Sequence, residues 1–156
     1  DEYKKAVSSG AVIKVYQGLM EYIMSLKTHF QKKYPDFSVT GGIYYGYMDM
    51  TYFPIITKSL KERELKTAVV FLHEPFRFEV WLSGKNKQVQ KKYWKLFSES
   101  GWDNYHIVPP GKGIDYIAVH ILTDNPDFSD LVTLTEQIEK GALDFICDVE
   151  KVLSIH

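Results

Sequence analysis

Hydrophobic residues change their spacing several times along the chain, and each change marks an expected element. From Ala11 to Tyr34 they recur every three or four positions, which predicts a long amphipathic helix. The same spacing predicts a middle helix over about Asn86–Ser100 and a last helix that ends near Leu153. Asp127 or Ser129 is the expected cap of that last helix, because a side-chain oxygen there accepts an unpaired backbone hydrogen.

The turn signal Glu74-Pro75 lies between two apolar runs and predicts a central β-hairpin. Ala68–Leu72 is apolar without interruption, as in a strand that is covered on both faces. Phe76–Leu82 alternates, so its successive side chains point to opposite faces. Pairing across the turn groups Val69, Phe71 and His73 with Phe76, Phe78 and Val80, and Ala68, Val70 and Leu72 with Arg77, Glu79 and Trp81. The first of these faces is core, and the second mixes core residues with charge.

Shorter segments extend the expected sheet. The aromatic stretch Phe37–Ile56 predicts another strand, interrupted near Gly46, since glycine in a strand marks a bulge or a close backbone approach. Thr57–Lys66 is charged and predicts a loop or a single helical turn. Tyr105–Val108 and Ile114–Thr123 predict further strands, the second chosen over a helix because its residues alternate.

Glycines refine the expected helices. Asp1–Ser9 predicts a short helix that ends at a left-handed Gly10. Gly18 lies inside the long N-terminal helix, where it indicates close packing against a neighbour or a bend. Gly141 is expected to split the last helix.

Together these elements predict an α+β fold. A mostly antiparallel sheet of four to five strands is expected to pack with a long N-terminal helix, a middle helix and a long C-terminal helix. Strands and helices do not alternate strictly, which disfavours a doubly wound parallel sheet. No linker or internal repeat interrupts the pattern, so residues 1–156 are expected to form a single domain.

Composition adds to this picture mainly by exclusion. With 45% hydrophobic and 15% aromatic residues, the 156-residue chain has enough apolar surface for a core and does not have the composition of a disordered protein. Its 19 basic and 20 acidic residues steer the molecule neither to nucleic acid nor to an acidic membrane. No apolar run approaches the roughly 18 residues of a membrane span, and the first residues lack signal-peptide character. The single cysteine, Cys147, excludes a disulfide framework and favours a cytoplasmic location; on its apolar helical face we expect a buried, inert thiol.

The mixed face of the hairpin and the tyrosine-rich strand form the strongest candidate site. Arg77 and Glu79 are two positions apart on one strand, so they are suited to bind a carboxylate or position a water, although a structural ion pair is the favoured interpretation of this pair alone. Clustered tyrosines beside Asp49 suggest a small-molecule pocket, although an aromatic core whose hydroxyls reach the surface is the favoured interpretation of the cluster alone. The candidate ligand-binding residues are Tyr45, Tyr47, Asp49, Tyr52, His73, Arg77, Glu79 and Trp81.

Motifs for established chemistries are missing from the sequence. It contains no serine-nucleophile pattern and no phosphate-binding glycine loop. His73, His106 and His120 lack the close spacing of metal ligands, so no metal and no cofactor are expected. An enzymatic function would rest on Asp49 and Glu79 as acid and base together with a histidine.

A line of lysines on the middle helix provides a further candidate surface. Lys87, Lys91 and Lys95 recur every four residues and are suited to contact phosphates, while the nearby Trp94 and Tyr105 are suited to stack on bases. A solvated helix face is the favoured interpretation, because the chain as a whole is not basic.

Specific residue patterns recur over nearly the whole chain. They lie in Gly18–Phe30, in Tyr45–Phe53 (Tyr-Gly-Tyr-Met-Asp-Met-Thr-Tyr-Phe), in Phe76–Leu82 (Phe-Arg-Phe-Glu-Val-Trp-Leu), in Lys92–Phe97 and in Asp124–Leu131. In these segments the chain resembles an uncharacterised bacterial family, known only as a domain of unknown function. The resemblance implies a bacterial, stand-alone cytoplasmic protein, and it supplies no activity, cofactor or catalytic residue.

The sequence therefore favours a non-enzymatic binding or accessory domain, with an aromatic pocket or surface for a small molecule or a protein partner and no membrane contact. Weak nucleic-acid binding through the lysine line is a disfavoured alternative, and so is an enzyme that uses Asp49 and Glu79. A pocket that exposes Tyr47, Asp49 and Glu79 together would favour the binding domain or the enzyme over the nucleic-acid binder.

Overall fold

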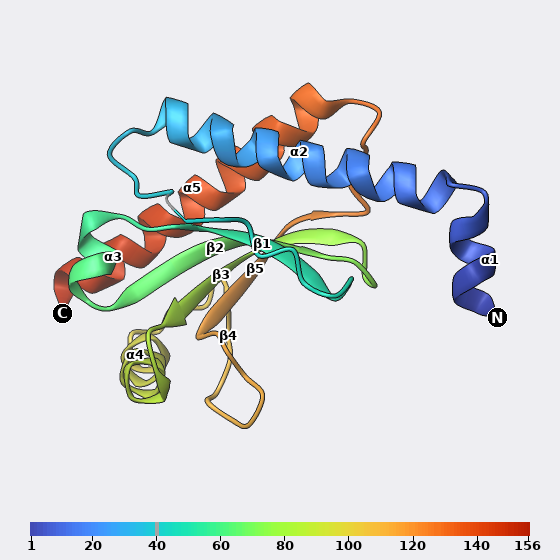
Figure 1. Cartoon of the computed structure of the whole chain (residues 1–156). Coiled ribbons are helices and arrows are strands. Elements are labelled where there is room, and N and C mark those ends of the chain that lie inside the picture. The colour runs from blue at the N-terminus through green and yellow to red at the C-terminus, as the bar shows by residue number, and fades with distance from the viewer. Residues whose placement is uncertain (40) are drawn as a thin grey trace.

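The computed structural model describes residues 1–39 and 41–156, and it confirms the α+β architecture (Figure 1). The strands are β1 (Met50–Ile55), β2 (Leu65–Leu72), β3 (Arg77–Gly84), β4 (His106–Ile107) and β5 (Ala118–Asp124). Over the described residues they form a five-stranded antiparallel sheet in the order β1-β2-β3-β5-β4. The helices are α1 (Glu2–Ser8), α2 (Ala11–Lys33), α3 (Lys58–Glu62), α4 (Lys87–Glu99) and α5 (Leu131–Ile155).

Helices α2 and α5 cover one face of the sheet; in Figure 1 α2 lies above the strands and α5 runs behind them. The Phe30 ring of α2 lies 6.1 Å from that of Phe53 on β1, and the Tyr22 ring lies 6.2 Å from that of Phe78 on β3. Phe145 of α5 belongs to the same buried cluster. These buried rings place the core between this face of the sheet and the two long helices. Burial of their apolar surface is the main driving force for folding.

The central hairpin has the predicted register. Val69 pairs with Val80 and Phe71 with Phe78 on the core side, and all four side chains are buried. On the other face the paired residues are Ala68 with Trp81, Val70 with Glu79 and Leu72 with Arg77. Ala68 and Val70 are buried on this second face as well, beside the larger side chains of Tyr52 and Trp81 on the neighbouring strands, which agrees with the uninterrupted apolar run of Ala68–Leu72.

A buried carboxylate joins the two long helices. Glu139 of α5 accepts hydrogen bonds from His29 Nε2 at 2.6 Å, from Lys33 Nζ at 2.7 Å and from the hydroxyl of Tyr34. His29 and Lys33 lie on α2, and Tyr34 follows its last residue. A buried charge requires such partners, so this cluster fixes how the end of α2 packs against α5.

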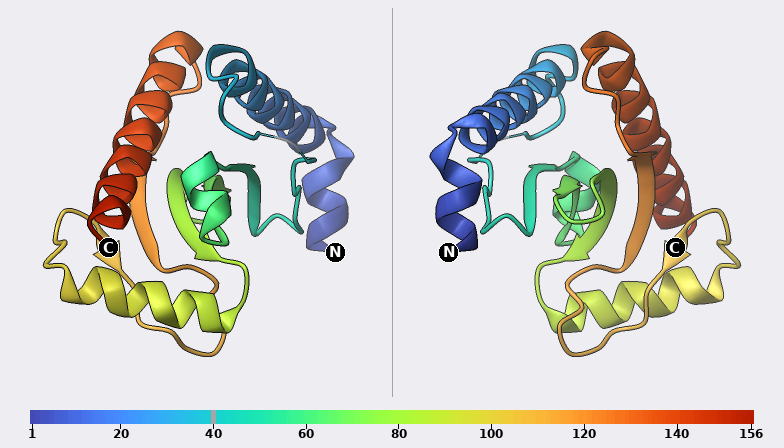
Figure 2. Two further views of the ribbon diagram at one scale, coloured as in Figure 1. Left: turned by 90° about the vertical axis from the view of Figure 1, so that its left-hand side faces the viewer. Right: turned by 90° about the vertical axis from the view of Figure 1, so that its right-hand side faces the viewer.

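Helix α4 follows the end of β3 and lies away from α2 (Figure 2), and its Tyr93 and Phe97 belong to the same core cluster as Phe145. Asn86 caps it, because its Oδ1 accepts the backbone hydrogen of Val89 at 2.9 Å. A Cβ atom on Gly84 would lie only 2.8 Å from the backbone nitrogen of Gln90. The absence of a side chain at Gly84 therefore lets the strand run directly against the first turn of the helix.

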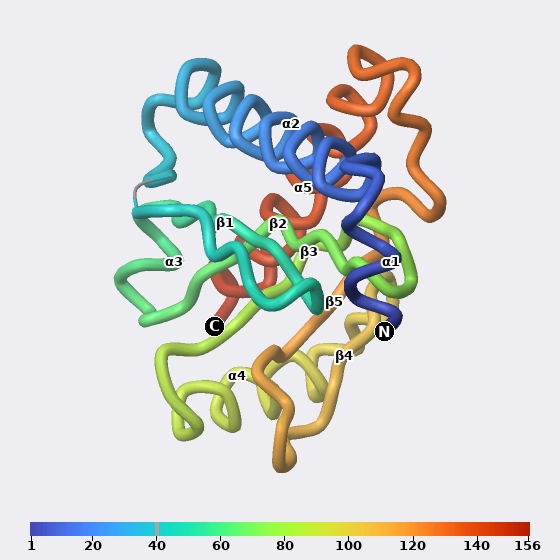
Figure 3. Tube along the Cα trace, turned by 45° about the vertical axis from the view of Figure 1, so that its right-hand side comes forward, coloured from blue at the N-terminus to red at the C-terminus, as the bar shows by residue number. Residues whose placement is uncertain are grey.

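The N-terminal arm has the expected glycine turn. Helix α1 leaves the beginning of α2 and buries none of its residues (Figure 3). Gly10, between the two helices, has a left-handed backbone with φ of 76°. The chain reverses there because glycine adopts this conformation without a steric penalty.

The predicted strand over Phe37–Ile56 is too long, because only Met50–Ile55 forms β1. Gly46 and Met48 have left-handed backbones, with φ of 74° and 64°, and this conformation turns the chain out of an extended path. Beyond the turn, the backbone of Tyr44 pairs with that of Tyr52. Thr40, which falls within the predicted range, lies outside the described residues.

The expected split at Gly141 and the expected close packing at Gly18 are also wrong, whereas the alternative of a bend at Gly18 stays a prediction. Helix α5 continues through Gly141, where a Cβ atom would lie 2.7 Å from Leu122 Cδ2. Gly141 therefore permits close packing of α5 on β5 and does not split the helix. At Gly18 no neighbouring atom lies within 4 Å of the position that a Cβ atom would occupy, so this glycine does not mark close packing.

The cap of α5 and the environment of the cysteine differ from expectation as well. Asp130 caps the helix, with Oδ1 accepting the backbone hydrogen of Thr133 at 3.2 Å, whereas Asp127 binds Ser129 in the preceding turn. Cys147 is exposed and not buried, because it lies outside the stripe that α5 turns toward the sheet.

Candidate functional site

Three side chains of β3 form a hydrogen-bonded row on the face opposite α2 and α5. Arg77, Glu79 and Trp81 alternate along the strand, so they share this face. Glu79 Oε2 accepts the Nε hydrogen of Arg77 at 2.6 Å, and Oε1 accepts the indole hydrogen of Trp81 at 2.8 Å. Glu79 is only 4% exposed. The guanidinium therefore balances a buried charge, and that charge holds the indole in one orientation.

We call this side of the sheet the open face, which bears Tyr52, Lys66, Trp81, Ser83 and Ile121. Lys66 is exposed, and Ile121 keeps 45% of its surface accessible. The register of β3 against β5 shifts between Phe78 and Glu79, which is a β-bulge. The bulge places Ile121 directly opposite Glu79 and strengthens the local twist of the face.

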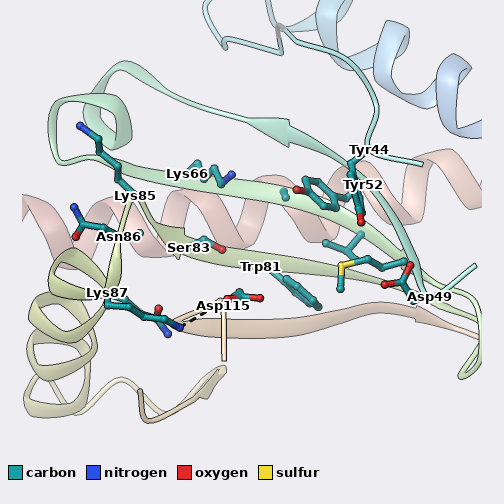
Figure 4. A pocket seen from close by; sticks show the side chains of 15 residues that line it. Tyr44, Asp49, Tyr52, Lys66, Trp81, Ser83, Lys85, Asn86, Lys87 and Asp115 are labelled. Atoms are coloured by element: carbon teal, nitrogen blue, oxygen red, sulfur yellow. Dashed lines mark ion pairs between the residues drawn. The ribbon is translucent and has the colours of Figure 1, made fainter. Parts of the chain in front are cut away.

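A cleft of about 560 Å³, here called the lysine cleft, lies over β1, β2 and β3 up to the start of α4 (Figure 4). Tyr44 and Tyr52 form one wall, with ring centroids 5.0 Å apart. Trp81 lies in its middle, and Asp49 lies beyond the tyrosines. The walls thus supply flat aromatic surfaces with polar groups at the rim, which is typical of small-molecule sites. The other lining residues are Met50, Lys66, Ala68, Val70, Ser83, Gly84, Lys85, Asn86, Lys87, Gln90 and Asp115.

The α4 end of the lysine cleft is basic. The Lys66 side chain makes no hydrogen bond or ion pair with any described residue, whereas Lys85 pairs with Glu64 at 3.1 Å. Lys87 donates to the carbonyl of Ile114 at 2.6 Å and lies 3.8 Å from Asp115. The Glu64 and Asp115 pairs are solvent-exposed, so they hold their lysines only weakly.

A second cleft of about 910 Å³, the histidine cleft, borders β3 and β5 on the other side of Trp81. The Tyr116 ring packs on Trp81, with centroids 4.5 Å apart. Burial lowers the pKa of His120 below its usual value. Burial, followed by the hydrogen bond to Asp148 at 2.5 Å, raises the pKa of Tyr105 well above its usual value. Both groups are therefore neutral at physiological pH. The remaining lining residues are Leu72, Arg77, Glu79, Asp103, Asn104, His106, Val119 and Ile121.

Comparison with known proteins places the chain in a family. The sequence profile of a family described as a domain of unknown function (DUF7000) matches residues 1–153. The chain belongs to this family. No curated protein and no solved structure matches it. The DUF7000 match supplies no activity, so the chemistry of the site must come from its geometry.

The DUF7000 chain brings part of the predicted site together. Tyr52, Asp49 and Trp81 line the lysine cleft, and Arg77 and Glu79 line the histidine cleft, with Trp81 in the walls of both. The expected pocket with Tyr47, Asp49 and Glu79 together is not formed. Tyr47 is 92% exposed, and Asp49 and Glu79 face different clefts.

The remaining predicted residues serve the turn before β1. Thr51 Oγ1 donates to the carbonyl of Tyr45 at 2.7 Å and lies 2.9 Å from His73 Nε2. Backbone hydrogens of Tyr47 and Met50 lower the pKa of Asp49, and the Asp49 carbonyl accepts the backbone hydrogen of His73 at 3.1 Å. Thr51 is on the core side of β1, opposite Phe71. His73 and Tyr45 therefore support the turn and do not line either cleft.

The lysine line on α4 is divided between two environments. Lys87 lines the lysine cleft, whereas Lys91 and Lys95 are exposed on α4 away from it. Trp94 is half-buried against the core, and Tyr105 is hydrogen-bonded at the histidine cleft. The five residues of the predicted nucleic-acid surface thus do not form a single surface.

The described residues contain neither a metal-binding cluster nor a membrane-spanning helix. No group of three or more His, Cys, Asp or Glu side chains in residues 1–39 and 41–156 is arranged to hold a metal ion. No helix in the same part of the chain is both long and apolar enough to cross a membrane.

Sequence reasoning missed Ser83 and Lys66, which lie opposite each other in the register of β2 and β3. The available signal was the alternation that identified Glu79 and Trp81. Continuing it by two residues reaches Ser83, and pairing across the hairpin reaches Lys66.

Proposed function

We propose that this chain is a non-enzymatic binding domain whose open face takes a ligand or partner with a flat aromatic group. The observation that carries the proposal is the bond between Glu79 and Trp81 at 2.8 Å, which fixes an aromatic ring between two clefts. A ring that is already ordered loses little conformational freedom on binding. Tyr44 and Tyr52 extend the aromatic surface on one side, and Tyr116 extends it on the other.

The arrangement of the carboxylates favours binding over catalysis. Both oxygens of Glu79 accept hydrogen bonds from its strand neighbours, so they serve to position Arg77 and Trp81. Acid–base catalysis with Asp49 and Glu79 would require both groups to reach one substrate. They line separate clefts, and backbone hydrogen bonds from Tyr47 and Met50 lower the pKa of Asp49, which disfavours its protonated, acid form.

Cellular origin and location form part of the proposal. The single cysteine suits a reducing compartment, and the sequence patterns resemble a bacterial family. We infer a bacterial protein that acts in the cytoplasm, where fractionation of cells that express a tagged copy would test the location.

A thermal-shift screen against metabolites, nucleotides and short peptides tests the binding function. A ligand at 100 times its Kd adds about 2.7 kcal/mol to stability, which is visible in a melt. Tyr44→Ala should abolish the shift because it removes a wall of the lysine cleft. Tyr47→Ala is the matched control, since Tyr47 is 92% exposed and does not line either cleft. Hits that survive Tyr44→Ala and Trp81→Leu alike, or a screen without hits, would refute the proposal.

A further inference from the structure

The α4 end of the lysine cleft combines features that favour a bound anion. Ser83 is only 9% exposed and lies on the wall of the cleft, and its hydroxyl forms no hydrogen bond with any described residue (Figure 4). No side-chain nitrogen or oxygen of the described residues is both buried and without a partner, so this hydroxyl opens into the cleft and is accessible to water. A ligand oxygen can therefore replace that water and pair with the hydroxyl.

The first turn of α4 adds donors at the same place. The backbone hydrogens of Lys87 and Gln88 are the first two of the helix and have no acceptor within it, and of these two residues Lys87 lines the cleft. Gly84 brings this turn directly against β3, next to Ser83. Helix N-termini of this kind carry partial positive charge and attract phosphate groups.

Charge around the cleft supports the same assignment. Lys66 lies opposite Ser83 in the sheet, and its ammonium group is unpaired among the described residues. Lys85 is held by an exposed pair with Glu64, and Lys87 by an exposed pair with Asp115 and a hydrogen bond to the carbonyl of Ile114. Exposed contacts of this kind are weak, so both lysines can turn to a stronger anion. Two carboxylates also line the cleft: Asp115 beside Lys87, and Asp49 at the far end beyond the tyrosines.

Trp81 lies two residues before Ser83 on the same face of β3, about 7 Å away along the strand. This separation suits a molecule in which a flat ring is joined through a short linker to an anion. A nucleoside phosphate has this form, and stacking of its base on an aromatic ring needs no particular base.

We propose that the lysine cleft binds a nucleoside phosphate, with the phosphate at Ser83, Lys66 and the first turn of α4, and the base on Trp81. The nucleoside phosphate is either a free nucleotide or one unit of a single strand. This proposal rests on the proposed binding function and names its ligand class.

NMR titrations of the full chain test the assignment. The probes are the four ribonucleoside 5′-monophosphates, the matching nucleosides, and single-stranded RNA hexamers. We expect the monophosphates to shift the amide signals of Ser83, Lys87 and Gln88 together with the Trp81 indole. The nucleosides should move the indole alone and bind about tenfold more weakly, because they lack charge-assisted hydrogen bonds.

Variants separate a local phosphate site from general attraction. Ser83→Ala and Lys66→Ala should each weaken binding of the monophosphate about tenfold. Lys91→Ala removes the same charge from the exposed side of α4, away from the cleft, and should change it less than about twofold. Circular dichroism and melting curves establish that each variant is folded.

The two sources of the ligand give different results, and either supports the proposal. A hexamer that binds more tightly than its monophosphate, with a steep dependence on salt, indicates a single strand. A monophosphate that binds while hexamers do not indicates a free nucleotide.

Other outcomes overturn the assignment. Monophosphates that bind no better than nucleosides, or that lose as much affinity in Lys91→Ala as in Lys66→Ala, contradict the phosphate site. If a different class of compound from the thermal-shift screen shifts the Trp81 indole, the nucleoside phosphate is wrong and the binding function stands. If no compound of any class moves Trp81, both proposals fail.

Discussion

Glu79 and Trp81 are two residues apart on β3, and the carboxylate of the first accepts the indole hydrogen of the second at 2.8 Å. Arg77 completes the row from the other side at 2.6 Å. The Glu79 carboxylate, only 4% exposed, thus lies buried at the open face and holds the Trp81 ring in one orientation.

Removing this carboxylate should destabilise the protein. Glu79→Ala leaves a partly buried guanidinium without its counter-charge and an indole without its acceptor, so we expect unfolding free energy to fall by about 3 kcal/mol. Glu79→Gln keeps one acceptor oxygen and should cost about half as much. Urea unfolding measures both losses, and the Trp81 indole proton signal should move upfield in Glu79→Ala.

The matched control is Glu21→Ala on the exposed side of α2, which removes an acidic side chain that makes no ion pair with any described residue. It should change stability by less than about 0.5 kcal/mol. Equal stability of Glu79→Ala and Glu21→Ala would show that the row does not hold the open face together.

A second prediction concerns the turn that precedes β1. At Gly46 the φ angle is +74°, and a Cβ atom would lie 2.1 Å from the carbonyl oxygen of Met50. Gly46→Ala therefore has two costs, a left-handed conformation at a residue with a side chain and a collision with the backbone. We expect the unfolding free energy, measured by thermal or urea unfolding, to fall by about 3 kcal/mol or more.

Gly113→Ala separates these two costs. Gly113 has a similar φ of +78° but nothing within 4 Å of a Cβ atom, so only the backbone term of about 1 kcal/mol applies. If the two variants lose the same stability, the collision at Met50 has no effect and the turn is looser than its geometry indicates.

The alternation of hydrophobic residues was enough to predict the centre of the sheet. The pairs Val70 with Glu79 and Ala68 with Trp81 follow from the turn at Pro75, because one register alone places Val69, Phe71, Phe78 and Val80 on a common apolar face. The row on β3 was found in the same way, since residues two apart on a strand are neighbours.

The interruption near Gly46 was predicted from the glycine and is confirmed, but the extent of the turn before β1 was not predictable by the same reasoning. Tyr45, Tyr47 and Asp49 continue the alternation of β1 in the sequence, but the left-handed residues Gly46 and Met48 break the extended path. A non-glycine residue such as Met48 seldom adopts this conformation, so the sequence carries no signal for it. Tyr47, which was predicted to belong to the site, therefore lies outside the clefts. Ser83, which was not predicted, lines the lysine cleft because α4 begins close to it.

The two helix glycines show a related limit. In the sequence both Gly18 and Gly141 are simply glycines inside a long helix. In the structure they differ, because of the two only Gly141 packs against another element. We therefore expect Gly18→Ala to raise unfolding free energy by about 1 kcal/mol, because alanine is the better helix former and the site has room.

Gly141→Ala has the same propensity gain but places a Cβ atom 2.7 Å from Leu122 Cδ2. We expect this variant to be at least about 1 kcal/mol less stable than Gly18→Ala, since the buried leucine must shift. Chemical denaturation of the pair gives the difference directly, and an equal gain in both variants would contradict the close packing of α5 on β5.

Acid sensitivity should come from the contact between α2 and α5. Burial opposes the charge of Glu139, but hydrogen bonds from Lys33, Tyr34 and His29 outweigh it and hold the pKa at about 2, below the ordinary value of 4.5. As the pH falls, Glu139 is therefore protonated at a higher pH in the unfolded chain than in the folded chain. The stabilisation is complete above pH 4.5 and is lost as the pH falls toward 2, with a total of about 2 kcal/mol after allowance for partial solvation.

Glu139→Gln removes the titrating group, so it should lower stability at neutral pH by about 2 kcal/mol and flatten the decline between pH 4.5 and 2. Urea unfolding at a series of pH values measures both effects. Glu136→Gln is the control on the same helix, because Glu136 is exposed and forms no ion pair with any described residue. Glu139→Gln can no longer bind the proton that makes stability depend on pH at this site. If the unfolding free energies of wild type and Glu139→Gln decline in parallel as the pH falls, the acid sensitivity belongs to other carboxylates.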